Sequence, residues 1–157
     1  MVKRLSNDYA QFNFSAASQF SWSPSTNTIN YPVSALRSQS GMWSLLHELG
    51  HAILGHTDYA SDLELLKIER AAWDEAQKIA ANYAILIDYD HVENCMDTYR
   101  EWLIKRSRCP VCSNTSLQLD INHYSCFNCG SEWRVPRSQA CRITRQAIKN
   151  PSDASRS

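Results

Sequence analysis

Residues 47–51 read His-Glu-Leu-Gly-His and combine side chains that bind metals with one that moves protons. On an α-helix, residues four positions apart lie on the same face, so His47 and His51 can point at one metal ion. Two imidazoles and one carboxylate are typical ligands of a catalytic zinc, whose fourth position is left for water. Glu48 follows the first ligand and is the expected general base, because it can accept a proton from that water.

The residues around this motif favour a buried helix over a chance match. The flanking segment from Met42 to Leu54 is mostly apolar. Gly50 permits another element to approach the motif closely, and Gly55 stands where a helix C-cap is expected. The alternative is a buried helix with two satisfied core histidines. It leaves the glutamate unexplained, since charged residues are almost never fully buried unless they are paired or bind a metal.

A second helical pattern, residues 61–87, contains the expected third ligand. One face of this pattern is apolar or aromatic at every position except Glu69. A lone glutamate in a buried stripe requires a cationic partner, and a zinc ion would be one. Two rival ligands follow the motif directly. The first is His56, which is either a ligand or a structural residue just past the helix. The second is Asp58, which as a loop aspartate is expected to be solvated.

Two Cys-x-x-Cys pairs form a separate metal-binding pattern. Thirteen residues lie between the pairs, whose members are Cys109, Cys112, Cys126 and Cys129. This spacing predicts a zinc ribbon with four thiolates around one zinc ion and short strands at 117–119, 123–124 and 133–135. So small a module cannot bury a sufficient core, so the metal is expected to stabilise its fold. Cys95 is expected to pack in a helix, and Cys141 is expected to have no special role.

The segment 47–56, His-Glu-Leu-Gly-His-Ala-Ile-Leu-Gly-His, resembles the ImmA/IrrE-type metallopeptidases when it is taken together with Glu69-Arg-Ala-Ala-Trp-Asp-Glu-Ala. The resemblance covers roughly residues 18–88. It implies a gluzincin-like site, with zinc on the two histidines of the motif and Glu69 and with Glu48 as the catalytic base. It also implies an intracellular protein substrate such as a repressor. Trp73 stands where the family usually has Asn or Asp, and Asp74 is an alternative residue for orienting a histidine.

The sequence also resembles a second family, the SprT-like proteases, which join an HExxH domain to a C-terminal zinc ribbon and act on DNA-bound proteins. Their third zinc ligand is a histidine. His56 lies only five residues after His51, which is too near for that role. This resemblance is therefore the weaker of the two.

The length of 157 residues fits one domain followed by a small module. Residues 1–99 carry a net charge of −6 and residues 100–157 one of +6, which favours a boundary near residue 107. We therefore expect a metallopeptidase domain over 1–106, a zinc ribbon over 107–136, and a basic, partly disordered tail over 137–157. No segment approaches the roughly 20 apolar residues that span a bilayer, and no secretory signal is recognisable. The expected location is cytoplasmic.

The predicted fold class is α+β, with a small zincin-like domain. A β-hairpin is expected where two runs of alternating apolar residues, 19–23 and 28–32, flank a turn cluster. Its free edge is expected either to take a substrate backbone as an added strand or only to cover the core. The motif helix is expected from about residue 41 to 54, and a third helix over 90–106.

The function that these patterns favour is a zinc-dependent metalloendopeptidase with one catalytic and one structural zinc, in which the zinc ribbon serves stability or targeting. Either Tyr83 or His91 is expected as an additional electrophile. The alternative is a nucleic-acid- or protein-binding zinc module whose HExxH domain is not catalytic. For nucleic acid, the candidate contacts are the basic Arg106, Arg108, Arg134 and Arg137, with Tyr124 and Trp133 for base stacking.

Overall fold

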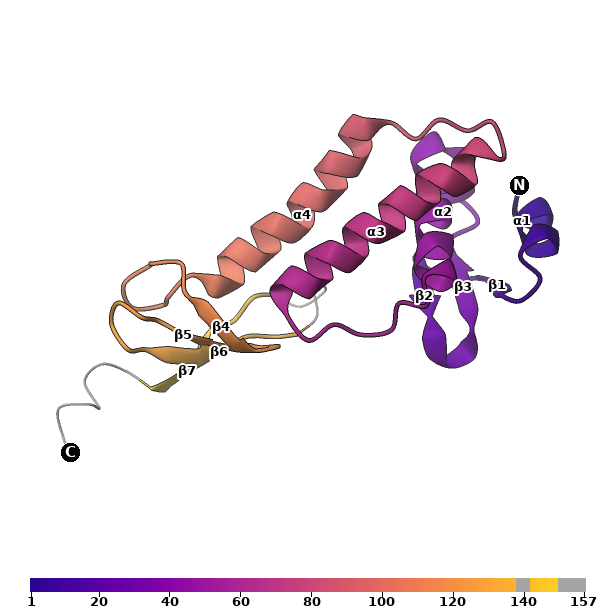
Figure 1. Ribbon diagram of the computed structural model, residues 1–157. Helices are drawn as coiled ribbons and strands as arrows, with labels where there is room; N and C mark the ends of the chain where they lie inside the picture. The colour runs from indigo at the N-terminus through magenta and orange to yellow at the C-terminus, as the bar shows by residue number, and fades with distance from the viewer. Residues whose placement is uncertain (138–141, 150–157) are drawn as a thin grey trace. The chain divides into compact units, whose positions relative to one another are not determined.

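The computed structural model describes residues 1–137 and 142–149, and its architecture is α+β, as predicted (Figure 1). The elements in chain order are α1 Val2–Asp8, β1 Asn13–Ala16, β2 Ser21–Ser23, β3 Thr28–Tyr31, α2 Gln39–Ile53, α3 Asp62–Ala81, α4 Tyr89–Ser107, β4 Leu117–Asp120, β5 His123–Ser125, β6 Glu132–Arg134 and β7 Gln146–Lys149. Among the described residues, no helix has both the length and the apolar character needed to cross a membrane.

The chain divides into two compact units. The first unit contains Met1–Asp58 and Lys67–Cys95, and the second contains Tyr59–Leu66 and Met96–Ser157. The division therefore falls inside α3 and α4, whereas the sequence predicted a single boundary near residue 107. Each unit has its own sheet.

In the first unit, the strand order is β1-β3-β2, so β2 lies at an edge of the sheet. The antiparallel pairing of β2 with β3 confirms the predicted hairpin, whereas the parallel pairing of β1 with β3 was not predicted. Asn27, with φ at 51°, ends the turn of the hairpin in the left-handed region. α2 packs against β2 and β3, where Ile29 is fully buried.

Both ends of α2 are capped, and of the two caps the sequence predicts the one at Gly55. At the start, the Ser38 hydroxyl accepts a hydrogen bond from the Gly41 backbone at 3.0 Å. At the end, Gly55 has a φ of 66°, which L-residues rarely adopt. The backbone N–H of Gly55 donates to the carbonyl of Ala52, and that of His56 donates to the carbonyl of His51. These two bonds form a Schellman motif, which turns the chain back over the last turn of α2.

α3 approaches α2 closely and ends earlier than expected. A Cβ built on Gly50 would overlap the carbonyl oxygen of Ala72, so only glycine permits this approach of the two helices. The predicted helix runs to residue 87, but α3 ends at Ala81. Ala84 has a φ of 55°, and the N–H of Ile85 donates to the carbonyl of Ala80, which closes the helix without a glycine.

In the second unit, the sheet has the order β4-β5-β6-β7. The first three strands confirm the predicted ribbon strands, and β7 was not predicted. Tyr124 and Trp133 stack in its core, with ring centroids 5.7 Å apart. β7 lies within the predicted tail. The rest of that prediction, over 138–141 and 150–157, lies outside the described residues, as does Cys141.

Candidate metal centres

Three donor atoms from α2 and α3 converge in the first unit. His47 Nε2 lies 3.0 Å from His51 Nε2 and 3.2 Å from a carboxylate oxygen of Glu69, which is itself 3.5 Å from His51 Nε2. All three residues are buried. In a tetrahedral zinc site with the usual bond lengths, ligand atoms lie about 3.3 Å apart. The arrangement is therefore compatible with zinc.

The charge of Glu69 is stabilised by the two histidines that face it. Burial alone would raise the pKa of this carboxyl group, but hydrogen bonds from His47 and His51 and the charge on their rings lower it to about 2. Glu69 is thus a carboxylate over the whole physiological pH range. A buried carboxylate that faces two imidazoles is a donor set typical of a divalent transition metal.

Glu48 directly follows His47 on α2, and its side chain is half-buried. Burial raises the pKa of its carboxyl group, and the charges of His47 and His51 and a hydrogen bond from the Trp22 backbone partly offset this effect. Trp22 is the middle residue of β2, and it is aligned with Ile29 of β3. The edge strand β2 therefore reaches Glu48 through its backbone.

His56 contacts the ligand set without joining it. Its Nδ1 lies 2.9 Å from Nδ1 of His51, so one ring donates a hydrogen bond to the other through the nitrogen that faces away from Glu69. The Schellman motif that ends α2 holds this arrangement, since it returns residue 56 to residue 51. The backbone carbonyl of His56 accepts a hydrogen bond of 2.8 Å from the Trp22 indole. The sequence offered two alternatives to Glu69 as the third ligand. His56 instead orients the ligand His51, and Asp58 is exposed.

An aromatic cluster holds His47. Its ring stacks on Trp73, with centroids 4.2 Å apart and planes inclined at 27°. The His91 ring is nearly perpendicular to that of Trp73, with centroids 5.6 Å apart. Nδ1 of His47 is buried, and no described residue hydrogen-bonds to it. Asp74 does not orient a histidine, because it is exposed and lies 4.0 Å from Arg70. The sequence could not reveal the stack, since a tryptophan on a buried helix face is ordinarily part of the core.

The two residues expected as an additional electrophile have different surroundings. The Tyr83 hydroxyl donates a hydrogen bond of 2.6 Å to Asp8 on α1. His91 lies near His47, and burial together with the charge of that ring lowers its pKa. Its Nε2 is 3.6 Å from the sulfur of Cys95, which is half-buried on α4. Of the two, only His91 belongs to the neighbourhood of the ligand set.

The four ribbon cysteines converge in the second unit. The sulfur atoms of Cys109 and Cys129 are 3.6 Å apart, and those of Cys112 and Cys126 are 3.5 Å apart. A tetrahedral zinc site with the usual Zn–S bonds places sulfur atoms about 3.8 Å apart. Burial would raise the pKa of Cys126, but hydrogen bonds from the Ser116 hydroxyl and neighbouring backbone lower it to about 6. This cluster is therefore compatible with zinc as well.

Some residues expected to contact nucleic acid are buried. Arg106 is 0% exposed, donates a 2.6 Å hydrogen bond to the carbonyl of Ile121, and lies over the Trp102 ring. Tyr124 and Trp133 are buried as well, so neither can stack on a base. The prediction is wrong for these three residues, because their contacts come from segments distant in the sequence. Arg108, Arg134 and Arg137 are exposed.

Residues 9–143 match the family model of the IrrE N-terminal-like domain, a family of peptidases. This match covers most of the chain, and the chain belongs to that family. It therefore contains a zinc metallopeptidase-like domain, which agrees with the resemblance found in the sequence. No curated protein and no solved structure matches the chain.

Proposed function

We propose that this member of the IrrE N-terminal-like family is a zinc metalloendopeptidase that hydrolyses a peptide bond in an extended segment of an intracellular protein. The observation that carries the proposal is the convergence of His47, His51 and Glu69 beside the half-buried carboxyl group of Glu48. Three ligands leave one position of a tetrahedral ion open, which distinguishes a catalytic site from a closed structural one.

Each of these residues has a separate role in the proposed reaction. His47, His51 and Glu69 hold the zinc ion, which when bound supplies a Lewis acid that polarises a carbonyl group and acidifies water. Glu48 takes a proton from the attacking water and delivers it to the leaving amine. Its raised pKa suits the first step, because a carboxylate with a raised pKa is a stronger base than a fully solvated one.

The edge strand β2 supports an extended substrate. The backbone of Trp22, in the edge strand β2, reaches the Glu48 carboxyl group. An extended peptide that pairs with this edge would add a strand to the sheet and run past the proposed base. A folded protein offers few such segments, so we expect cleavage in loops, linkers or termini. A repressor or another regulatory protein remains the predicted substrate class.

The second zinc ion is proposed to be structural. Cys109, Cys112, Cys126 and Cys129 offer four sulfur atoms, which complete a tetrahedron and leave no position for water. The predicted cytoplasmic location agrees with this role, because a reducing compartment keeps the cysteines as thiols. The chain would then bind two zinc ions, one per candidate centre.

A peptide library tests the proposal without knowledge of the natural substrate. Wild type with zinc would be incubated with peptides derived from a whole proteome, and new termini would be identified by mass spectrometry. We expect cleavage that chelation abolishes and that Glu48→Gln loses while it retains its zinc. Equal cleavage by Glu48→Gln would show that another group is the base. No zinc-dependent cleavage by wild type would favour a non-catalytic HExxH domain.

Zinc content measured on the same samples tests the ligand set. Glu69→Ala is expected to lower the content from about two zinc ions per chain to about one, since the loss of one ligand of three sharply weakens a site. The matched control is Glu75→Ala, on the same helix and paired with Lys78 at 2.8 Å. This control should leave the zinc content unchanged. Two zinc ions retained in Glu69→Ala would contradict its assignment as a ligand.

A further inference from the structure

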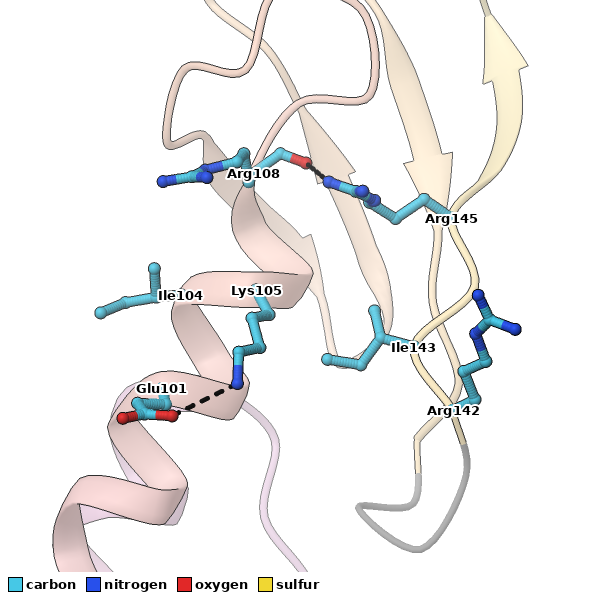
Figure 2. A pocket seen from close by; sticks show the side chains of 7 residues that line it. All are labelled: Glu101, Ile104, Lys105, Arg108, Arg142, Ile143 and Arg145. Atoms are coloured by element: carbon cyan, nitrogen blue, oxygen red, sulfur yellow. Dashed lines mark hydrogen bonds and ion pairs between the residues drawn. The ribbon is translucent and has the colours of Figure 1, made fainter.

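A cavity in the second unit is lined mostly by cations. Its volume is about 540 Å³, and it lies between the last turn of α4 and the segment that leads into β7 (Figure 2). The lining residues are Glu101, Ile104, Lys105, Arg108, Arg142, Ile143 and Arg145. Four cations thus face one carboxylate, which gives the cavity a net charge of +3. The cavity lies outside both candidate metal centres.

The cations differ in how far they are already engaged. Lys105 is 3.2 Å from Glu101, and both side chains are about two-thirds exposed, so this pair is weak. Arg145 donates a 3.0 Å hydrogen bond to the backbone carbonyl of Arg108 and so caps the end of α4. Arg108 and Arg142 are exposed, and neither guanidinium group pairs with a carboxylate in the part of the chain that the structure describes. Figure 2 shows that Arg108 comes from the end of α4 and Arg142 from the segment that leads into β7.

We propose that this cavity binds the phosphate backbone of a nucleic acid. Guanidinium groups match the geometry of phosphate oxygens, and the cations on both sides fit a chain of regularly spaced negative charges. Ile104 and Ile143 give the cavity an apolar surface between the cations, on which sugars or bases can lie. The binding would be largely independent of sequence, since phosphate contacts position a protein without reading bases.

This site differs from the one that the sequence suggested. Of the four arginines expected to contact nucleic acid, only Arg108 lines the cavity, and Arg106 is buried. The other cations of the cavity come from the last turn of α4 and from the segment before β7, which are far apart in the sequence. Only the fold brings them together.

The test measures binding of a fluorescent single-stranded DNA of about 20 nucleotides to the full-length, zinc-loaded protein by anisotropy at several salt concentrations. Four phosphate contacts predict a slope of log K against log salt of about −2.8, or roughly 50-fold weaker binding from about 50 to about 200 mM salt. The double variant Arg108→Gln/Arg142→Gln removes two contacts, so its slope should be about −1.4, or roughly a 7-fold change over the same range. A duplex of the same sequence shows whether the cavity prefers single or paired strands.

A double variant with the same loss of charge is the control. Lys3→Gln/Arg37→Gln changes two exposed cations of the first unit that do not line the cavity. Wild-type affinity and slope in this control support the cavity as the site. An equal loss in both double variants would overturn the proposal, because net charge alone would then explain the binding.

Two further outcomes would also overturn the proposal. One is no binding by wild type at about 50 mM salt, where phosphate contacts are strongest. The other is displacement of the DNA by polyglutamate as effectively as by unlabelled DNA, which would identify an acidic protein surface as the partner. Zinc content is measured on every variant. If the double variant lost ribbon zinc, Arg142→Gln alone would serve, with an expected slope about 0.7 smaller in magnitude than that of wild type.

Discussion

Gly50→Ala tests the close packing of α2 and α3, on which the candidate catalytic centre depends. Helix propensity alone predicts that alanine stabilises a helix interior by about 1 kcal/mol relative to glycine. The structure predicts the opposite sign, because the new Cβ would overlap the carbonyl group of Ala72. Overpacking of this kind costs about 1–3 kcal/mol, and the upper end applies here because backbone atoms cannot escape by changing rotamer. The net effect is therefore a destabilisation of about 2 kcal/mol.

Urea denaturation followed by circular dichroism measures this change in the free energy of unfolding, with equal zinc in all samples. Ser44→Gly and Ser44→Ala provide the control on the same helix, and their difference should be about 1 kcal/mol in favour of alanine. Relief of the overlap must also separate the helices, so Gly50→Ala should bind zinc more weakly at the candidate catalytic centre. A Gly50→Ala protein that is more stable than wild type would refute the close approach.

Three further predictions concern other contacts. His56→Phe keeps a ring but removes the hydrogen bond to the ligand beside it, so zinc affinity measured by chelator competition should fall about 10- to 100-fold, whereas His123→Phe in the other unit should leave the candidate catalytic centre unchanged. Burial lowers the pKa of His91 below 6.5, so the unfolded state binds more protons and stability falls as pH drops through 6.5. In His91→Gln this fall between about pH 7.5 and 5 should be smaller, and an unchanged pH dependence would contradict it. Asp62→Asn removes the carboxylate 3.8 Å from the fully buried Arg106 and should destabilise the second unit by about 3 kcal/mol in thermal unfolding, whereas a change below about 0.5 kcal/mol would show that the pair is unimportant.

The sequence predicted those features that depend on local spacing. The four-residue step from His47 to His51 and the cap at Gly55 both follow from helix geometry, which is the same in every protein. The convergence on Glu69 was also predictable, because a single acidic residue in an apolar stripe is rare and requires a partner. The two cysteine pairs were readable for the same reason, since their spacing is set by the metal they would bind.

The features that the sequence did not predict depend on contacts between distant segments. Ala84 ends α3 in a left-handed conformation that glycine usually provides, so the sequence carried no stop signal there. Arg106 looks like a solvated cation in the last turn of a helix, and only the fold shows Asp62 and Ile121 around it. β7 lies in a polar segment, and its pairing with β6 is visible only in three dimensions.

The two histidines of the motif are held by different interactions, and this difference determines how the centre responds to movement. His51 is oriented by His56, five residues away in the same chain segment, so that contact persists if α3 shifts. His47 is held by stacking on Trp73, which lies on the same helix as Glu69. α3 therefore supplies one donor atom directly and orients a second through a ring contact. A small displacement of α3 relative to α2 would disturb two of the three donors at once, and the glycine that permits their close approach thereby controls the geometry of the whole set.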